Sequence, residues 1–133
     1  MTEIASMPWT VERANKALPL VRRIAADLVR AYSQWRELVE RFEVVSTSNT
    51  TASSEEAERL QREVQRVAAE IEDFVEELHD LGVECKSFET GLLDFPAERD
   101  GRPVYLCWQH GEPRVAHWHE IDAGFAGRQP LQE

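Results

Sequence analysis

The sequence predicts an α+β fold in which a long antiparallel helical hairpin, similar to a coiled coil, precedes a small antiparallel β-sheet. Three observations support this prediction. Apolar residues recur in steps of three and four up to about residue 82, polar turn formers interrupt that pattern once, and apolar and polar residues alternate after it. Because 133 residues suit one domain, we expect a single domain over 1–133, with the hairpin at 10–82 and a β-meander with an irregular tail at 83–133.

The first helical region follows a short lead-in, 1–9, and begins after Thr10, a residue type that caps helix N-termini. Pro19 interrupts the apolar stripe of this region. Because proline removes one backbone hydrogen bond, we expect either a short helix up to Leu18 followed by a long one, or a kinked helix. The stripe has heptad spacing and comprises Val11, Ala14, Leu18, Val21, Ala25, Leu28, Tyr32, Trp35, Val39 and Phe42.

The segment 46–54 is rich in serine and threonine and is predicted to be the loop of the hairpin. Ser53 stands three residues before Glu56, which is the capping-box arrangement, so we expect the second helix to begin here. Gly82 followed by Val83 indicates a left-handed cap at the end of this helix. Basic residues early in the first helix and acidic residues late in the second favour an antiparallel orientation.

The chain after Gly82 shows the alternation that is typical of strands. Pro96 is expected to mark the end or the edge of a strand, because proline cannot donate a backbone hydrogen bond. Short turns favour antiparallel neighbours, and the tail is expected to pack back on the sheet through Phe125 and Leu131. The predicted strands are 83–88, 92–96, 103–109 and 114–121.

The composition excludes several classes of function. A formal net charge of -10, from 25 acidic and 15 basic residues, argues against a nucleic-acid or anionic membrane surface. No apolar run approaches the roughly 20 residues that cross a bilayer, and the N-terminus lacks the features of a signal peptide. Two cysteines are too few for a disulfide framework. We therefore expect a cytoplasmic protein that binds neither membranes nor nucleic acids.

Several segments stand out together: WTVERANKALPLVRRI, GLLDFP, RDGRPVYLCW, GEP and WHEIDAGFAGRQPL. Across nearly the whole chain they resemble the uncharacterised bacterial family called domain of unknown function 2203. The resemblance implies a small cytosolic bacterial protein and brings no established activity. His117 stands where the family pattern has an aromatic residue. The residues that share the pattern are Asp94, Gly101, Arg102, Tyr105, Cys107, Trp108, Gly111, Glu112, Trp118, His119, Gly124 and Arg128.

One part of the predicted sheet gathers residue types that bind metals. His117 and His119 are two residues apart on one predicted strand, so they project from the same face about 7 Å apart. Cys107 lies on a neighbouring predicted strand, and Asp94 or Glu112 would add a carboxylate. These are zinc ligands, so a divalent metal such as zinc would be the cofactor of this site. The alternative is that the histidines lie on a solvated sheet face and that Cys107 fills a small space in the core.

Three arginines, Arg128, Arg102 and Arg114, could form a pocket for a small anion, because guanidinium groups bind carboxylate or phosphate through paired hydrogen bonds. The alternative is that Arg128 pairs with a nearby acidic residue and fixes the tail. No nucleophile with an accompanying base can be recognised, so the sequence does not decide whether the protein is an enzyme.

The apolar stripe of the first helix is wider than one partner helix covers, which predicts a homodimer in which two hairpins form a four-helix bundle. Coverage of the stripe by the sheet is the alternative. Because heptad helices explain most of the chain, the leading hypothesis is a structural or protein-interaction module. A metal-binding protein or metal-dependent enzyme comes second, and a small-anion-binding regulator third.

Overall fold

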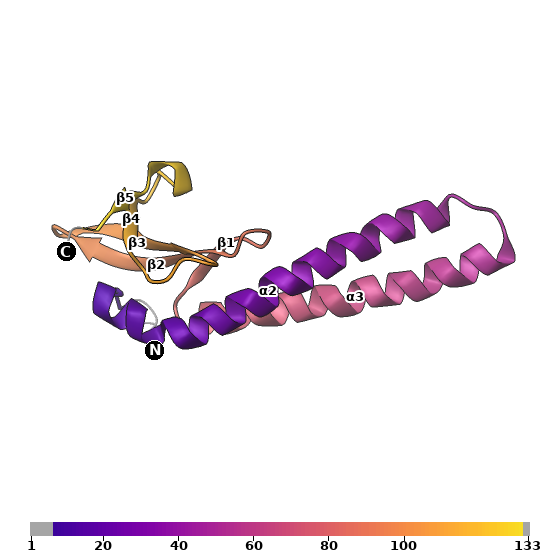
Figure 1. Ribbon diagram of the computed structural model, residues 1–133, viewed down its shortest axis with the longest axis horizontal. Coiled ribbons are helices and arrows are strands. Elements are labelled where there is room, and N and C mark those ends of the chain that lie inside the picture. Colours follow the sequence, from indigo (N-terminus) through magenta and orange to yellow (C-terminus); the bar gives the residue numbers. More distant parts are fainter. Residues whose placement is uncertain (1–6, 132–133) are drawn as a thin grey trace.

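A computed structural model describes residues 7–131, so residues 1–6 of the predicted lead-in and residues 132–133 lie outside the described residues. Helices α2 (Val11–Ser46) and α3 (Thr51–Asp80) form a long antiparallel hairpin, and a small sheet packs against one end of it (Figure 1). The predicted α+β fold is confirmed. All five strands pair antiparallel in chain order, β1 (Glu84–Ser87), β2 (Leu92–Arg99), β3 (Arg102–Gln109), β4 (His117–Glu120) and β5 (Gln129–Pro130), with a 3-10 turn η1 (Phe125–Gly127) before β5.

Helix α2 runs without interruption past Pro19. The expected division into a short and a long helix is therefore wrong. Figure 1 shows instead that the first turns of α2 point in a different direction from the rest, as expected of a kinked helix. Leu18 and Val21, on either side of the proline, are both buried in the core, so packing keeps the two parts in one helix. Thr10 caps α2 as predicted, because its side-chain oxygen accepts a hydrogen bond from the Arg13 N–H at 3.1 Å.

The ends of α3 are fixed by two different caps. Thr50, not Ser53, is the N-cap: its side chain accepts from the Ser53 N–H at 3.0 Å, while the Ser53 hydroxyl accepts from the Thr50 N–H at 3.1 Å. The helix therefore begins three residues earlier than predicted, because serine and threonine can take either role in a capping box. The predicted cap at Gly82 is confirmed by its φ of 87° and by the bond from the Val83 N–H to the Leu78 carbonyl at 2.9 Å.

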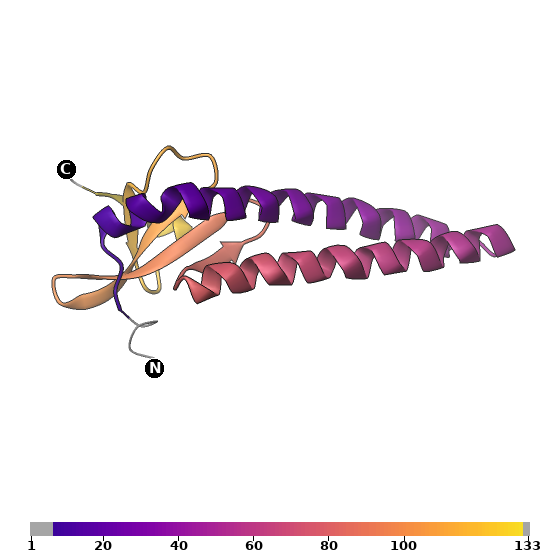
Figure 2. The ribbon, with the colours of Figure 1, turned by 90° about the horizontal axis from the view of Figure 1, so that it is seen from below.

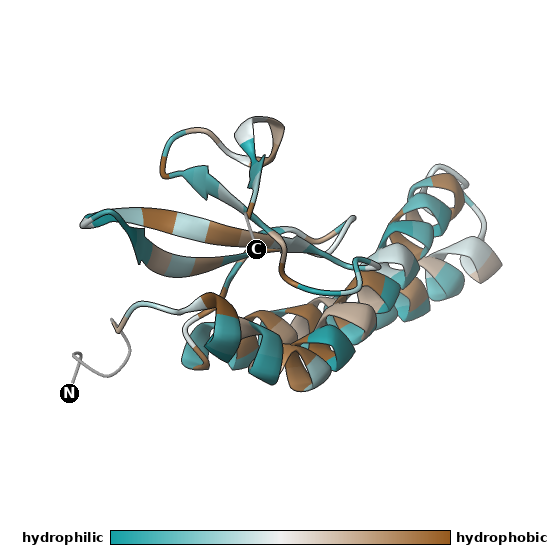
Figure 3. Cartoon of the chain, turned by 60° about the vertical axis from the view of Figure 1, so that its left-hand side comes forward, coloured by the Kyte–Doolittle hydropathy of each residue, from teal (hydrophilic) through white to brown (hydrophobic). Residues whose placement is uncertain are grey.

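The core lies between the inner face of the sheet and the part of the hairpin nearest to it, which includes the first half of α2. Figure 2 shows that the strands lie beside only the first half of α2, so the rest of the hairpin projects beyond the sheet. Figure 3 shows hydrophobic and hydrophilic segments alternating along the helices and strands. The inner face of β2 and β3 provides Leu93, Phe95, Leu106 and Trp108, and α2 provides Ala14, Leu18, Val21, Ala25 and Leu28. The sheet thus covers the first half of the apolar stripe.

Two strands differ in length from those predicted. Strand β2 continues through Pro96, although proline has no backbone N–H to donate. The carbonyl of Pro96 accepts a hydrogen bond from the Trp9 N–H at 2.7 Å, so the backbone of Pro96 faces the side where β1 has already ended. The missing N–H therefore costs no hydrogen bond between strands. Strand β4 is shorter than predicted, because the Asn15 side chain takes both backbone groups of Val115, donating to its carbonyl at 3.3 Å and accepting from its N–H at 2.8 Å. None of the helices in residues 7–131 has an apolar stretch long enough to span a membrane.

Gly91, in the turn before β2, packs against α2 at a position where only glycine fits. Its φ is 70°, and a Cβ here would lie 2.6 Å from the Cβ of His110 and 3.0 Å from Cγ2 of Val29. We expect Gly91→Ala to lower the free energy of unfolding by more than about 1 kcal/mol in urea denaturation, because strain and a clash combine. Gly101→Ala is the control, since Gly101 has a φ of 78° and a Cβ added there would meet nothing within 4 Å. Equal losses in the two variants would mean that the clash contributes nothing.

Candidate functional site

The strand register places the metal-binding residue types on one face of the sheet. Cys107 on β3 lies opposite Asp94 on β2 and opposite His117 on β4, and His119 lies opposite Tyr105. Directly paired residues, and residues two apart on a strand, share a face. All five side chains therefore belong to the outer face, which points away from the helices. Alternation along a single strand cannot decide whether residues of neighbouring strands share a face, and the register shows that they do here.

Three of these residues converge closely. One possible ligand atom each from Asp94, Cys107 and His119 lies within 4.8 Å of the other two. Nε2 of His119 lies 3.0 Å from Oδ1 of Asp94. The exposed fraction is 3 % for Asp94, 2 % for His119 and 0 % for Cys107, so the cluster is shielded from bulk water. We call these three residues the outer-face cluster.

The tautomer of His119 follows from its neighbours. Nδ1 lies 2.7 Å from the backbone carbonyl of Glu120, and a carbonyl oxygen can only accept, so Nδ1 carries a proton and donates it. The contact between Nε2 and Asp94 then requires one further proton, which the imidazole and the carboxyl share. If that proton leaves, Nε2 presents a lone pair toward Asp94 and Cys107. A backbone acceptor on the second nitrogen is the usual support of a metal-binding histidine.

Burial dominates the acidity of the other two members of the cluster. It raises the pKa of Asp94, although the hydrogen bond and charge of His119 oppose the shift. Burial, together with the negative charge of Asp94, also raises the pKa of the Cys107 thiol to about 11, although Arg128 opposes this. At neutral pH Cys107 is therefore a thiol. A cysteine of this kind is a weak nucleophile, so the site does not support nucleophilic catalysis by Cys107.

Arg128 closes one side of the outer-face cluster. Its guanidinium forms an ion pair with Glu112, donates to Sγ of Cys107 at 3.7 Å and lies 3.1 Å from Nδ1 of His117. Burial opposes the ionisation of Glu112, yet the bonds from Arg128 and from the Gln109 N–H hold its pKa below the usual 4.5. Glu112 and His117 therefore surround Arg128 and lie outside the cluster of three. Arg128 fixes the tail through Glu112, as the alternative interpretation proposed.

The other two arginines of the predicted anion pocket lie elsewhere. Arg102 donates to Glu120 at 3.1 Å and stands five residues from Cys107 on the same strand, about 17 Å away at the rise of an extended chain. Arg114 is exposed in the segment before β4. The structure therefore does not bring the three arginines together, and the guanidinium of Arg128 is already occupied.

The family model of the uncharacterised conserved protein DUF2203 matches residues 8–131, which is almost the entire described part of the chain. The chain belongs to this family. No curated protein and no solved structure matches it. Membership of DUF2203 brings no activity with it, so a function must be argued from the geometry of the site.

Two residues that sequence analysis did not include in the site cover the cluster in this DUF2203 chain. The ring of Tyr105 lies 5.4 Å from the ring of His119, centroid to centroid, and Nζ of Lys86 lies 5.1 Å from the centroid of Tyr105. Glu84 joins them, since it accepts from the Tyr105 hydroxyl at 3.2 Å and pairs with Lys86 at 2.9 Å. The two-residue spacing between Tyr105 and Cys107 places both on one face, but the sequence carries no signal for Lys86 on β1.

Proposed function

We propose that this DUF2203 member is a metal-binding protein that holds one divalent transition metal, such as zinc, between Asp94, Cys107 and His119. The convergence of a carboxylate, a thiol and an imidazole within 4.8 Å of one another carries the proposal. Zinc at about 2.0 to 2.3 Å from three tetrahedral ligands sets the ligand atoms roughly 3.3 to 3.8 Å apart. The cluster therefore has to contract by only about 1 Å to hold the ion.

Charge balance supports the proposal. The outer-face cluster without metal has no net charge, because the shared proton neutralises the Asp94 and His119 pair and Cys107 is a thiol. Binding of a divalent cation displaces that shared proton and the thiol proton, leaving one carboxylate, one thiolate and a neutral imidazole around two positive charges. The net charge is again zero. Burial therefore penalises neither state for an uncompensated charge.

The surroundings of the cluster suit the same role. The Glu120 carbonyl holds the Nδ1–H of His119, which fixes the ring with Nε2 toward the other two ligands. Arg128 donates to the sulfur of Cys107, and this contact strengthens when the sulfur becomes a thiolate. Three protein ligands leave a fourth position on a tetrahedral zinc for water or another small ligand.

Elemental analysis of protein purified without a histidine tag tests the proposal. We expect about one metal per chain, and we expect its loss in His119→Ala and in Cys107→Ser. His79→Ala is the matched control, because His79 is exposed on α3 and lies outside the cluster. Substoichiometric metal that does not fall further in His119→Ala would overturn the proposal and leave the Asp94 and His119 pair as a structural hydrogen bond.

A second function, protein–protein interaction that includes self-association, is favoured by a groove at the point where the hairpin leaves the sheet. Tyr32 and Trp35 stack with ring centroids 5.8 Å apart, and Phe88 packs edge-on against Tyr32 at 5.8 Å. Phe88 is still 38 % exposed. The sheet covers the first half of the stripe that suggested a four-helix bundle, so the groove, rather than the stripe, now supports self-association as a homodimer or larger homo-oligomer.

A further inference from the structure

The groove has an apolar floor and an acidic rim. Its largest part, about 450 Å³, runs between α3 and the turn after β1, and a second part of about 190 Å³ continues it toward Tyr32 and Trp35. Ile71, Val75 and Phe88 form the floor of the larger part. Glu72 and Glu76 stand beside it, in a stretch of α3 from 70 to 80 with six acidic residues and no lysine or arginine. A large apolar side chain flanked by positive charges fits such a groove.

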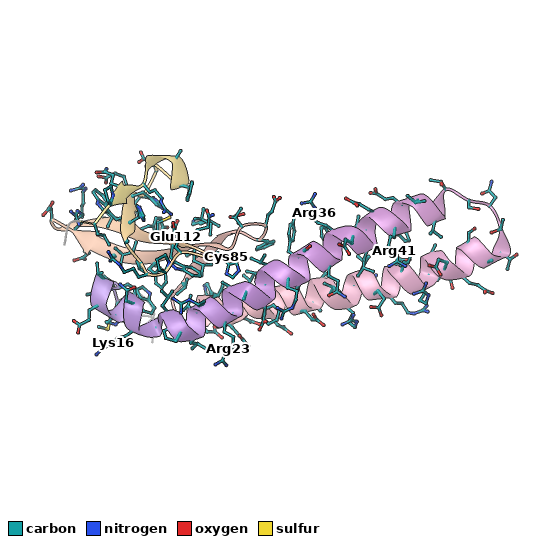
Figure 4. The ribbon with its side chains drawn as sticks, in the orientation of Figure 1. Lys16, Arg23, Arg36, Arg41, Cys85 and Glu112 are labelled. Carbon is teal, nitrogen blue, oxygen red and sulfur yellow. The ribbon has the colours of Figure 1, made fainter. Side chains whose placement is uncertain are left out.

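The same chain displays such a group on α2. Lys16, Leu20 and Arg23 follow the four-plus-three spacing that puts residues on one helix face. Leu20 is 47 % exposed, which makes it one of the few large apolar side chains left in water. Figure 4 shows Lys16 and Arg23 on the side of α2 that faces away from the sheet, opposite Arg36. We call these three residues, Lys16, Leu20 and Arg23, the basic stripe.

Neither set of charges is neutralised within the described chain. The ion pairs between residues 7–131 join residues of one helix, residues within 84–128, or Arg36 to Glu89. Lys16 and Arg23 take part in none of these pairs, and Glu72 and Glu76 take part in none either. Exposed charges of opposite sign on two surfaces of one molecule are complementary between two copies.

We propose that the groove binds the basic stripe of a second copy of this chain, with Leu20 on its floor and Lys16 and Arg23 beside Glu72 and Glu76. The inference rests on the second function above, that the chain self-associates. Along a helix Lys16 and Arg23 are about 10 Å apart, and Glu72 and Glu76 about 6 Å, so long basic side chains span the difference. Leu20 lies between the charges on one helix, as Val75 does on the other.

The two proposed contact surfaces lie on different parts of the chain. The basic stripe points away from the sheet, whereas the groove includes Phe88 of the sheet's own first turn. Because the contact joins two different surfaces of the chain, two copies can exchange it reciprocally in a twofold dimer or repeat it head to tail in a ring or a chain. One leucine and four charges make a small interface, so the association is weak, strengthens with protein concentration and weakens with salt.

Light scattering at about 100 µM protein and low salt tests the proposal. We expect a mass above the 15.3 kDa of one chain, and a return to that mass in Lys16→Glu/Arg23→Glu and in Glu72→Lys/Glu76→Lys. A mixture of the two variants should associate again, because the unchanged basic stripe of the groove variant meets the unchanged acidic groove of the stripe variant. Glu55→Lys/Glu58→Lys, on the distal part of α3, makes the same charge change as the groove variant and should leave the association unaltered.

The outcomes separate this inference from the function on which it rests. Wild-type protein that associates while both stripe and groove variants associate equally well would overturn this surface and leave self-association standing. Wild-type protein that keeps a mass of 15.3 kDa under these conditions would overturn self-association and, with it, this inference. Melting curves of each variant show whether a lost contact reflects unfolding, which is not expected because all four substituted side chains are exposed.

Discussion

Zinc affinity is expected to rise at least about tenfold for each unit of pH between pH 6 and pH 8. Binding through a thiolate displaces the thiol proton of Cys107, and each displaced proton contributes about a tenfold change per pH unit. The thiol proton of Cys107 is present throughout this range, because burial and Asp94 raise its pKa to about 11. The proton between Nε2 of His119 and Oδ1 of Asp94 adds to this dependence wherever the metal-free cluster holds it. Competition against a chelator of known affinity at each pH measures this dependence.

Proton release provides an independent measurement of the same step. Adding zinc to weakly buffered protein in the presence of a pH indicator should release at least about one proton per bound metal, the thiol proton of Cys107. His79→Ala, which removes an exposed histidine outside the cluster, should release the same number and serves as the control. An affinity that does not change with pH, or zinc binding without proton release, would show that Cys107 does not bind as a thiolate.

The helices could be predicted because local spacing determines how they pack. The heptad stripe from Val11 to Phe42 required no knowledge of the sheet, and the Gly82 cap depends only on adjacent residues. The start of α3 could not be fixed in the same way, since the serines and threonines of 46–54 offer several equivalent caps. The continuity of α2 through Pro19 depends on the sheet, which holds both sides of the proline in one core.

The candidate site could be predicted in part. The residue types of Asp94, Cys107 and His119 indicate metal ligands, and the register of three strands brings these residues together. His117 shares their face but contacts Arg128, which arrives from the tail after η1. Local spacing carries no information about a contact made by a segment that returns to the sheet from outside it. The division between proposed ligands and supporting residues therefore required the tertiary structure.

Loss of Arg128 is expected to be the most damaging change on the outer face that removes no proposed ligand. Arg128→Met should lower the free energy of unfolding by about 2 kcal/mol at neutral pH, because it leaves Glu112 partly buried without its partner. The two side chains are 13 % and 25 % exposed, which places the expected loss below that of a fully buried pair. Urea denaturation measures the loss. Arg102→Met is the control, since Arg102 and Glu120 are 47 % and 39 % exposed and solvent screening should make the loss of this pair much less damaging.

The effect of Arg128→Met should also depend on pH in a defined direction. The folded protein holds the pKa of Glu112 below its usual 4.5, so the pair stabilises the fold fully above that value and loses its contribution as the pH falls through the lower, folded pKa. The difference in stability between wild type and variant should therefore be largest near neutral pH and shrink below pH 4.5. A difference that stays constant into acid would mean that Arg128 acts through packing on Phe125, whose ring centroid lies 4.6 Å from its guanidinium carbon, rather than through Glu112.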